Sequence, residues 1–119
     1  MTHQTAHHAA IAGADAGRQV AQLRQVLTLV GEIAGLRSTP AIGDAALDEA
    51  ARVSSAYGDA LPVVQRRFDA LASEASAWAA AGVEALVAAS ERGSAKHAAR
   101  RLAEELERTL SDLSAMLPL

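Results

Sequence analysis

The sequence contains no cysteine and only one residue of each aromatic type, namely Tyr57, Phe68 and Trp78. Without cysteine, disulfide bonds, thiolate catalysis and cysteine-ligated zinc sites are excluded. β-Branched residues are few and scattered, which argues against a β-sheet. Alanine, by contrast, occupies thirty positions, and it is the best intrinsic helix former although it buries little apolar area. The composition therefore predicts an all-α protein with a thin core.

Long apolar runs are also missing. The longest, Ala75–Val83, lies between two glutamates and is far shorter than the roughly 20 residues that span a bilayer. The N-terminus has no lysine or arginine before Arg18, and it has no apolar segment of the kind found in signal peptides. We therefore expect no signal peptide and a cytoplasmic location. The formal net charge of −3 favours neither nucleic acid nor an anionic membrane surface as a partner.

Apolar residues recur at spacings of three and four along four segments, which predicts four amphipathic helices at about residues 16–36, 45–57, 60–91 and 95–117. The expected core positions are Val20, Leu23, Leu27, Val30 and Ala34 in the first helix; Leu47, Ala50, Val53 (or Ser54) and Tyr57 in the second; Val64, Phe68, Leu71, Ala75, Trp78, Gly82 and Leu86 in the third; and Ala99, Leu102, Leu106, Leu110, Leu113 and Leu117 in the fourth.

The N-terminal residues 1–17 are rich in alanine and histidine and include Gly13 and Gly17. Each glycine weakens a helix by about 1 kcal/mol relative to alanine. We therefore expect a frayed or partly helical segment over residues 1–17, followed by a single helical-bundle domain over residues 18–119.

Several residues are typical of helix ends. Pro40 is expected to stop the first helix, because the residue before a proline avoids the α region. Asp44 and Ser94 are expected N-caps of the second and fourth helices. Gly58 is expected to take the left-handed conformation just after the second helix, and Gly93 is expected to stop the third helix.

Four helices with short connections predict an up-down-up-down bundle with a short second helix and a long third helix. The second helix has about half the residues of the third and cannot cover its whole apolar stripe. We expect the uncovered part to contact the folded-back N-terminal segment, a second copy in a homodimer, or a partner helix. The candidate interface residues are Phe68, Leu71, Trp78, Gly82 and Leu86.

The junction between the third and fourth helices is a candidate anion-binding site. Free amides at a helix N-terminus attract anions, and cations in a first turn oppose the helix dipole unless an anion relieves them. The alternative is that Glu91, Glu104 and Glu105 neutralise these cations on a solvated face. The candidate residues are Ser94, Lys96, Arg100 and Arg101.

The fragment His97-Ala98-Ala99-Arg100 resembles the phosphoacceptor segment of histidine-phosphotransfer domains, which are helical bundles of similar size. The resemblance implies that His97 accepts a phosphoryl group. It covers about four residues: Arg100-Arg101-Leu102 stands where those domains continue with a Lys-Gly-Ser type sequence, and His97 is on the last helix instead of a central one.

Other chemistry is weakly represented. His3 and His7, with His8 adjacent, have the spacing for metal chelation on a helix. No carboxylate lies nearby in the sequence and the segment begins at the chain end, so we interpret it as a mobile terminus and expect no metal and no cofactor. Motifs for di-iron, zinc-protease, dinucleotide and nucleoside-triphosphate sites are absent. We therefore expect a non-enzymatic helical interaction protein that associates with itself or with a partner helix through its third helix.

Overall fold

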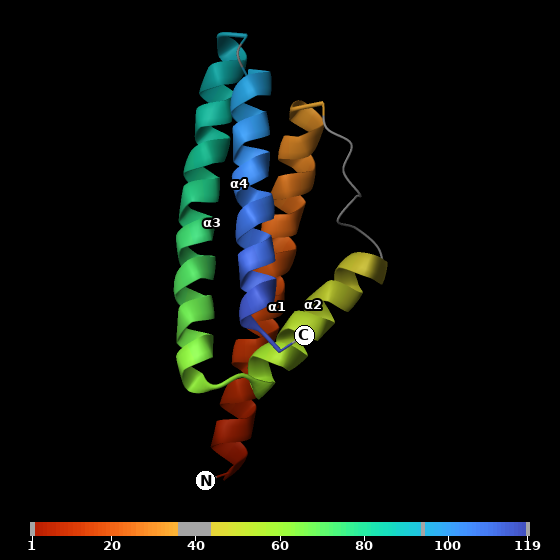
Figure 1. The fold of residues 1–119 in the computed structure, drawn as a ribbon, viewed down its shortest axis with the longest axis vertical. Helices are drawn as coiled ribbons and strands as arrows, with labels where there is room; N and C mark the ends of the chain where they lie inside the picture. Colours follow the sequence, from red (N-terminus) through yellow and green to blue (C-terminus); the bar gives the residue numbers. More distant parts are fainter. Residues whose placement is uncertain (1, 36–43, 94, 119) are drawn as a thin grey trace.

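The computed structural model describes residues 2–35, 44–93 and 95–118, with side chains described for 12–35, 46–93 and 95–118. The helices are α1 (Thr2–Ile33), α2 (Asp44–Asp59), α3 (Pro62–Glu91) and α4 (Ala95–Met116), and the described residues contain no strand. They run up, down, up and down along the bundle (Figure 1). The predicted all-α bundle with a short second and a long third helix is confirmed.

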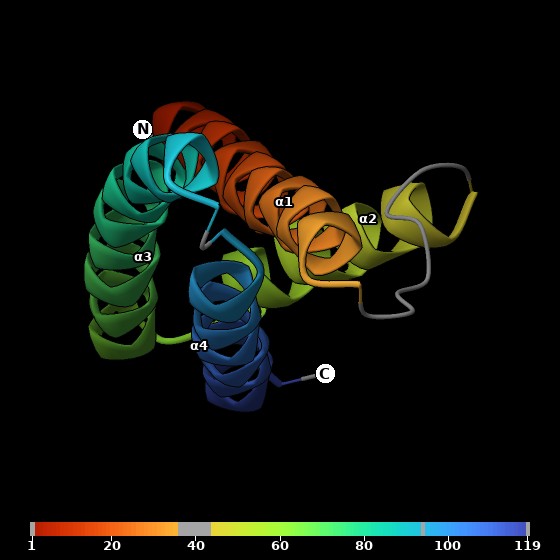
Figure 2. The same ribbon diagram turned by 90° about the horizontal axis from the view of Figure 1, so that it is seen from above.

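The four helices do not form a square. α1, α3 and α4 pack against one another, whereas α2 packs mainly against α1. Seen from the side and from above, α2 leans outward, with its N-terminal end farthest from α3 and α4 (Figures 1 and 2). The side of α1 and α3 that faces away from α2 is therefore left without a fourth helix.

The N-terminal helix is longer than predicted. α1 begins at Thr2, inside the segment that was expected to be frayed or partly helical, and its 32 residues exceed the 30 of α3, so the third helix is not the longest. Gly13 and Gly17 are buried where α1 crosses α2. The absence of a Cβ lets the α2 backbone approach closely there. The interhelix contact thus offsets the low helix propensity of the two glycines.

Two of the helix ends depend on glycine. Gly35 and Gly93 have φ values of 74° and 75° and end α1 and α3 in the left-handed conformation, and the stop predicted at Gly93 is confirmed. Gly58, in contrast, lies inside α2 without a positive φ, so its predicted role as a helix stop is wrong. The predicted signals at Pro40, the Asp44 side chain and Ser94 lie outside the described residues.

The core follows the predicted stripes of α1 and α4 closely. Every predicted α1 position is buried, and in α4 only Leu102 is partly exposed. The prediction that Leu47 of α2 belongs to the core is wrong, because this side chain is 69% exposed at the end of the helix that leans outward. Small side chains fill much of the remaining core and were not predicted: Ala16, Ala56, Ala72, Ala79, Ala89 and Ala103.

Tyr57 attaches the end of α2 to α3. Its ring packs edge-on against Phe68 with centroids 5.5 Å apart, and its hydroxyl lies 2.9 Å from both carboxylate oxygens of Asp69, to which it donates. The Gln65 side chain donates to the Tyr57 carbonyl at 2.7 Å. Burial, together with the hydrogen bond and charge of Asp69, raises the pKa of Tyr57 to about 12.

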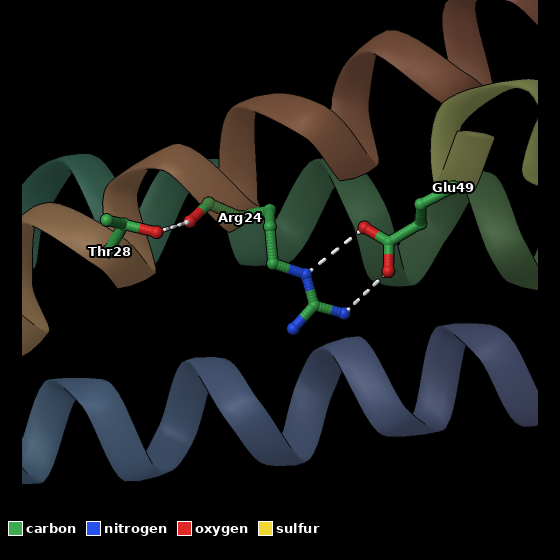
Figure 3. A network of polar contacts seen from close by, with 3 residues as sticks. All are labelled: Arg24, Thr28 and Glu49. Atoms are coloured by element: carbon green, nitrogen blue, oxygen red, sulfur yellow. Dashed lines mark hydrogen bonds and ion pairs between the residues drawn. The ribbon is translucent and has the colours of Figure 1, made fainter. Parts of the chain in front are cut away.

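A two-point ion pair holds α2 on α1. Arg24 donates from Nε to Glu49 Oε1 at 3.1 Å and from Nη2 to Oε2 at 2.8 Å, and both side chains are partly shielded from solvent (Figure 3). The Thr28 hydroxyl donates to the Arg24 carbonyl one turn along α1. Parallel guanidinium–carboxylate bonds fix orientation as well as distance, so this pair sets the angle at which α2 crosses α1.

Within the described residues, no helix combines the length and the apolar character needed to cross a membrane.

Candidate functional site

An apolar groove of about 380 Å³ lies between the C-terminal halves of α1 and α3, and we call it the α1–α3 groove. Most of its lining is aliphatic, and only Ser90 and Glu91 among the lining residues have polar side chains. The residues that line it are Leu29, Val30, Ile33, Val83, Leu86, Val87, Ser90, Glu91 and Ala95.

The groove exposes large aliphatic side chains that elsewhere would be covered. Leu29 is 54% exposed, Ile33 45% and Val87 60%. α2 packs farther toward the N-terminus of α1, at Gly13 and Gly17, and no described helix covers the groove. Contiguous exposed apolar surface of this kind is typical of interaction sites.

The charges beside the groove are mainly acidic. Glu91 lines it, while Glu32 and Glu84 are exposed and directly precede Ile33 and follow Val83 in the sequence. No lysine, arginine or histidine is among its described lining residues. A partner therefore meets an aliphatic floor with carboxylates along the edges.

The five predicted interface residues lie in different surroundings, with Leu86 alone lining the α1–α3 groove, and their role as an interface stays a prediction. Phe68 and Leu86 are buried, with exposures of 0% and 5%. The short second helix could not cover this part of the α3 stripe, and α1 and α4 cover it instead. Leu71, Trp78 and Gly82 are partly exposed. They do not belong to the α1–α3 groove, whose exposed side chains come from the neighbouring side of α3 and from α1.

Trp78 and Gly82 line a different recess, of about 390 Å³, between α3 and α4. A Cβ on Gly82 would lie 2.8 Å from a methyl carbon of Leu102, so the glycine accommodates this leucine between the helices. Arg101, predicted as an anion ligand, and Arg108 line this recess together with Glu104 and Glu105. Its charged lining of both signs distinguishes it from the mainly aliphatic α1–α3 groove.

The predicted anion site is only partly assembled. Lys96, His97 and Arg100 are exposed and line one shallow recess of about 380 Å³, but Arg101 lies on the α3–α4 recess and Ser94 is outside the described residues. No ion pair joins Lys96, Arg100 or Arg101 to an acid within the described part of the chain. The proposed neutralisation by glutamates therefore does not take the form of direct contacts.

Lys96 has a structural explanation of its own. Its Nζ lies 3.6 Å from where a Cβ on Gly35 would be, at the C-terminal end of α1. A cation is favoured there by the negative end of the α1 dipole, which compensates for its unfavourable place in the first turn of α4. Lys96, one of the two basic residues of the recess along with Arg100, thus has a role that requires no bound anion.

His97 is exposed in the first turn of α4, and no described side chain pairs with it; phosphoryl transfer stays a prediction. The side chains of His3, His7 and His8 lie outside the described residues. Elsewhere in the described chain, no group of three or more histidine and acidic side chains is arranged to hold a metal.

Comparisons with known proteins provide no template for the site: no family model, no curated protein and no solved structure was found to match the chain. The function of the α1–α3 groove is therefore argued from its own residues.

Proposed function

We propose that this chain is a non-enzymatic helical interaction protein whose α1–α3 groove binds the apolar face of a helix, supplied either by a second copy or by another protein. The observation that carries the proposal is the cluster formed by Leu29, Ile33 and Val87, each about half exposed around a ready-made groove. Grooves between packed helices commonly accept an amphipathic helix that inserts anchors at i, i+3 or i+4, and i+7.

The energetics favour reversible binding. Covering the exposed part of each of the three side chains contributes about 1 kcal/mol, and the apolar face of the partner gains a comparable amount. Ordering and desolvation on association offset part of this gain. The groove is therefore suited to a partner that binds and leaves, with only minor rearrangement of the bundle.

The groove can be tested with two charge-neutral double variants. Leu29→Gln/Val87→Gln, the groove variant, removes two exposed anchors, while Leu47→Gln/Leu61→Gln, the control variant, removes two leucines of 69% and 68% exposure elsewhere. Glutamine is a good helix former, and circular dichroism should show unchanged helix content in both.

The probe is a displayed library of short amphipathic helices with leucine on one face and lysine, glutamate or glutamine varied on its flanks. We expect selection on the wild-type chain to enrich helices that also bind the control variant but not the groove variant. Light scattering over a range of concentrations tests the second copy as occupant. A chain that stays monomeric and selects no groove-dependent helix contradicts the proposed function.

A further inference from the structure

We infer that the occupant of the α1–α3 groove is a single amphipathic helix of another protein, with lysine or arginine on both flanks of its apolar face, and not a second copy of this chain. This inference rests on the proposed function and narrows it to one class of partner.

The size of the groove fits one helix. Along α3 the lining extends from Val83 to Glu91, which is about 12 Å at roughly 1.5 Å per residue, or slightly more than two helical turns. A partner helix needs only three or four anchors to fill such a groove. Stable interfaces between two copies bury about 800 Å² and roughly 20–30 residues on each side, which is far more than the nine residues that line this groove.

Within the described side chains, the main apolar stripes of a second copy are not free to enter the groove. The apolar stripes of α1, α3 and α4 are already buried in its own core, so a symmetric contact would place groove against groove. Such an isologous contact brings the same surface of both copies together. It would set Glu32, Glu84 and Glu91 of one copy near the same acids of the other, and like charges across an interface disfavour association.

The acidic edges indicate the charge of the partner. Glu91 lines the groove. Glu84 and Glu32 are exposed, and helical spacing sets each one turn from a lining residue, Glu84 from Val87 on α3 and Glu32 from Leu29 on α1. The described cations that follow lining residues in the sequence, Arg92 and Lys96, both belong to the α3–α4 junction, and the Lys96 ammonium lies beside Gly35 at the end of α1. Basic flanks on a docked helix would therefore meet carboxylates on both sides, which contributes to specificity and to the rate of encounter.

The test compares the flanks of the selected helices. We expect groove-dependent binders to carry lysine flanks, and a lysine-flanked peptide to bind about tenfold more tightly than its glutamate-flanked counterpart at low ionic strength. High salt should shrink the difference. Glu84→Lys/Glu91→Lys, which changes two exposed side chains, should reverse the preference, while light scattering should show the wild-type chain to be a monomer.

Two results overturn the inference but leave the proposed function standing: groove-dependent binders with no flank preference, or a dimer that the groove variant dissociates. Absence of any helix whose binding the groove variant abolishes overturns both the inference and the function.

Discussion

Gly17 of α1 lies directly against the main chain of Ala50 in α2: a Cβ added to this glycine would stand 2.6 Å from the Ala50 carbonyl oxygen. Gly13, one turn earlier, meets the Ser54 carbonyl at 2.7 Å in the same way. Because the obstructing atoms belong to the backbone, no side-chain rotation makes room. These two glycines therefore determine how closely α2 packs on α1, and with it which side of α1 stays open.

Replacing one of these glycines should destabilise the fold. We expect Gly17→Ala to lower the free energy of unfolding by about 1–2 kcal/mol, because the strain of overpacking exceeds the gain of about 1 kcal/mol in helix propensity. Gly58→Ala is the matched control, since it is helical and a Cβ there meets nothing within 4 Å; it should stabilise. Urea denaturation followed by circular dichroism measures both. Equal stabilisation by the two alanines would contradict the close packing.

The ion pair between Arg24 and Glu49 should contribute measurably to the attachment of α2. A double-mutant cycle with Arg24→Ala and Glu49→Ala is expected to give a coupling energy of about 1 kcal/mol, at the upper end for partly exposed pairs. Arg24→Lys should lose most of it, because an ammonium cannot make two parallel bonds. Full stability in Arg24→Lys would show that charge alone, without the two-point geometry, holds α2.

The raised pKa of Tyr57 predicts that the protein loses stability at high pH. Its pKa is raised from 10.0 to about 12, so the folded state keeps a proton that the unfolded state releases. The stabilisation is therefore complete below pH 10.0 and is lost as the pH rises from 10.0 to about 12. Melting temperatures across this range should fall for the wild-type chain and fall less for Tyr57→Phe.

The titration itself can be followed directly, because Tyr57 is the only tyrosine of the chain. Tyrosinate absorbance of the folded protein should rise with a midpoint near pH 12. A midpoint near the ordinary value would mean that neither burial nor Asp69 holds the proton.

The sequence indicated most of the fold because a long stripe of leucine and valine on a helix is expected to face the core. Leu106, Leu110 and Leu113 are buried as their spacing predicts, since exposing a row of leucines is costly. Alanine carries this signal only where it continues a stripe of larger residues, as Ala34, Ala75 and Ala99 do. Ala72 and Ala103 are at 0% and 1% exposure, yet alanine is tolerated equally on a solvated face, so its place in the core depends on where neighbouring helices lie.

The groove could not be predicted for a related reason. Leu29 and Val87 lie beside the buried stripes of their helices, and a sequence does not show which flank another helix will cover. That outcome depends on α2, whose position follows from its contacts with Gly13 and Gly17. From the sequence, these two glycines suggested only a weakened helix. Leu47 was misplaced for the same reason, because the direction of a short helix depends on its contacts.

The most direct test of groove binding is methyl NMR of the chain as a lysine-flanked helix from the selection is added. If the helix binds in the α1–α3 groove, chemical-shift changes should be concentrated at Leu29, Ile33 and Val87, with saturation at a single site per chain. Changes centred instead on Leu102, in the recess beside Trp78, would place the binding surface between α3 and α4 and contradict binding in the groove.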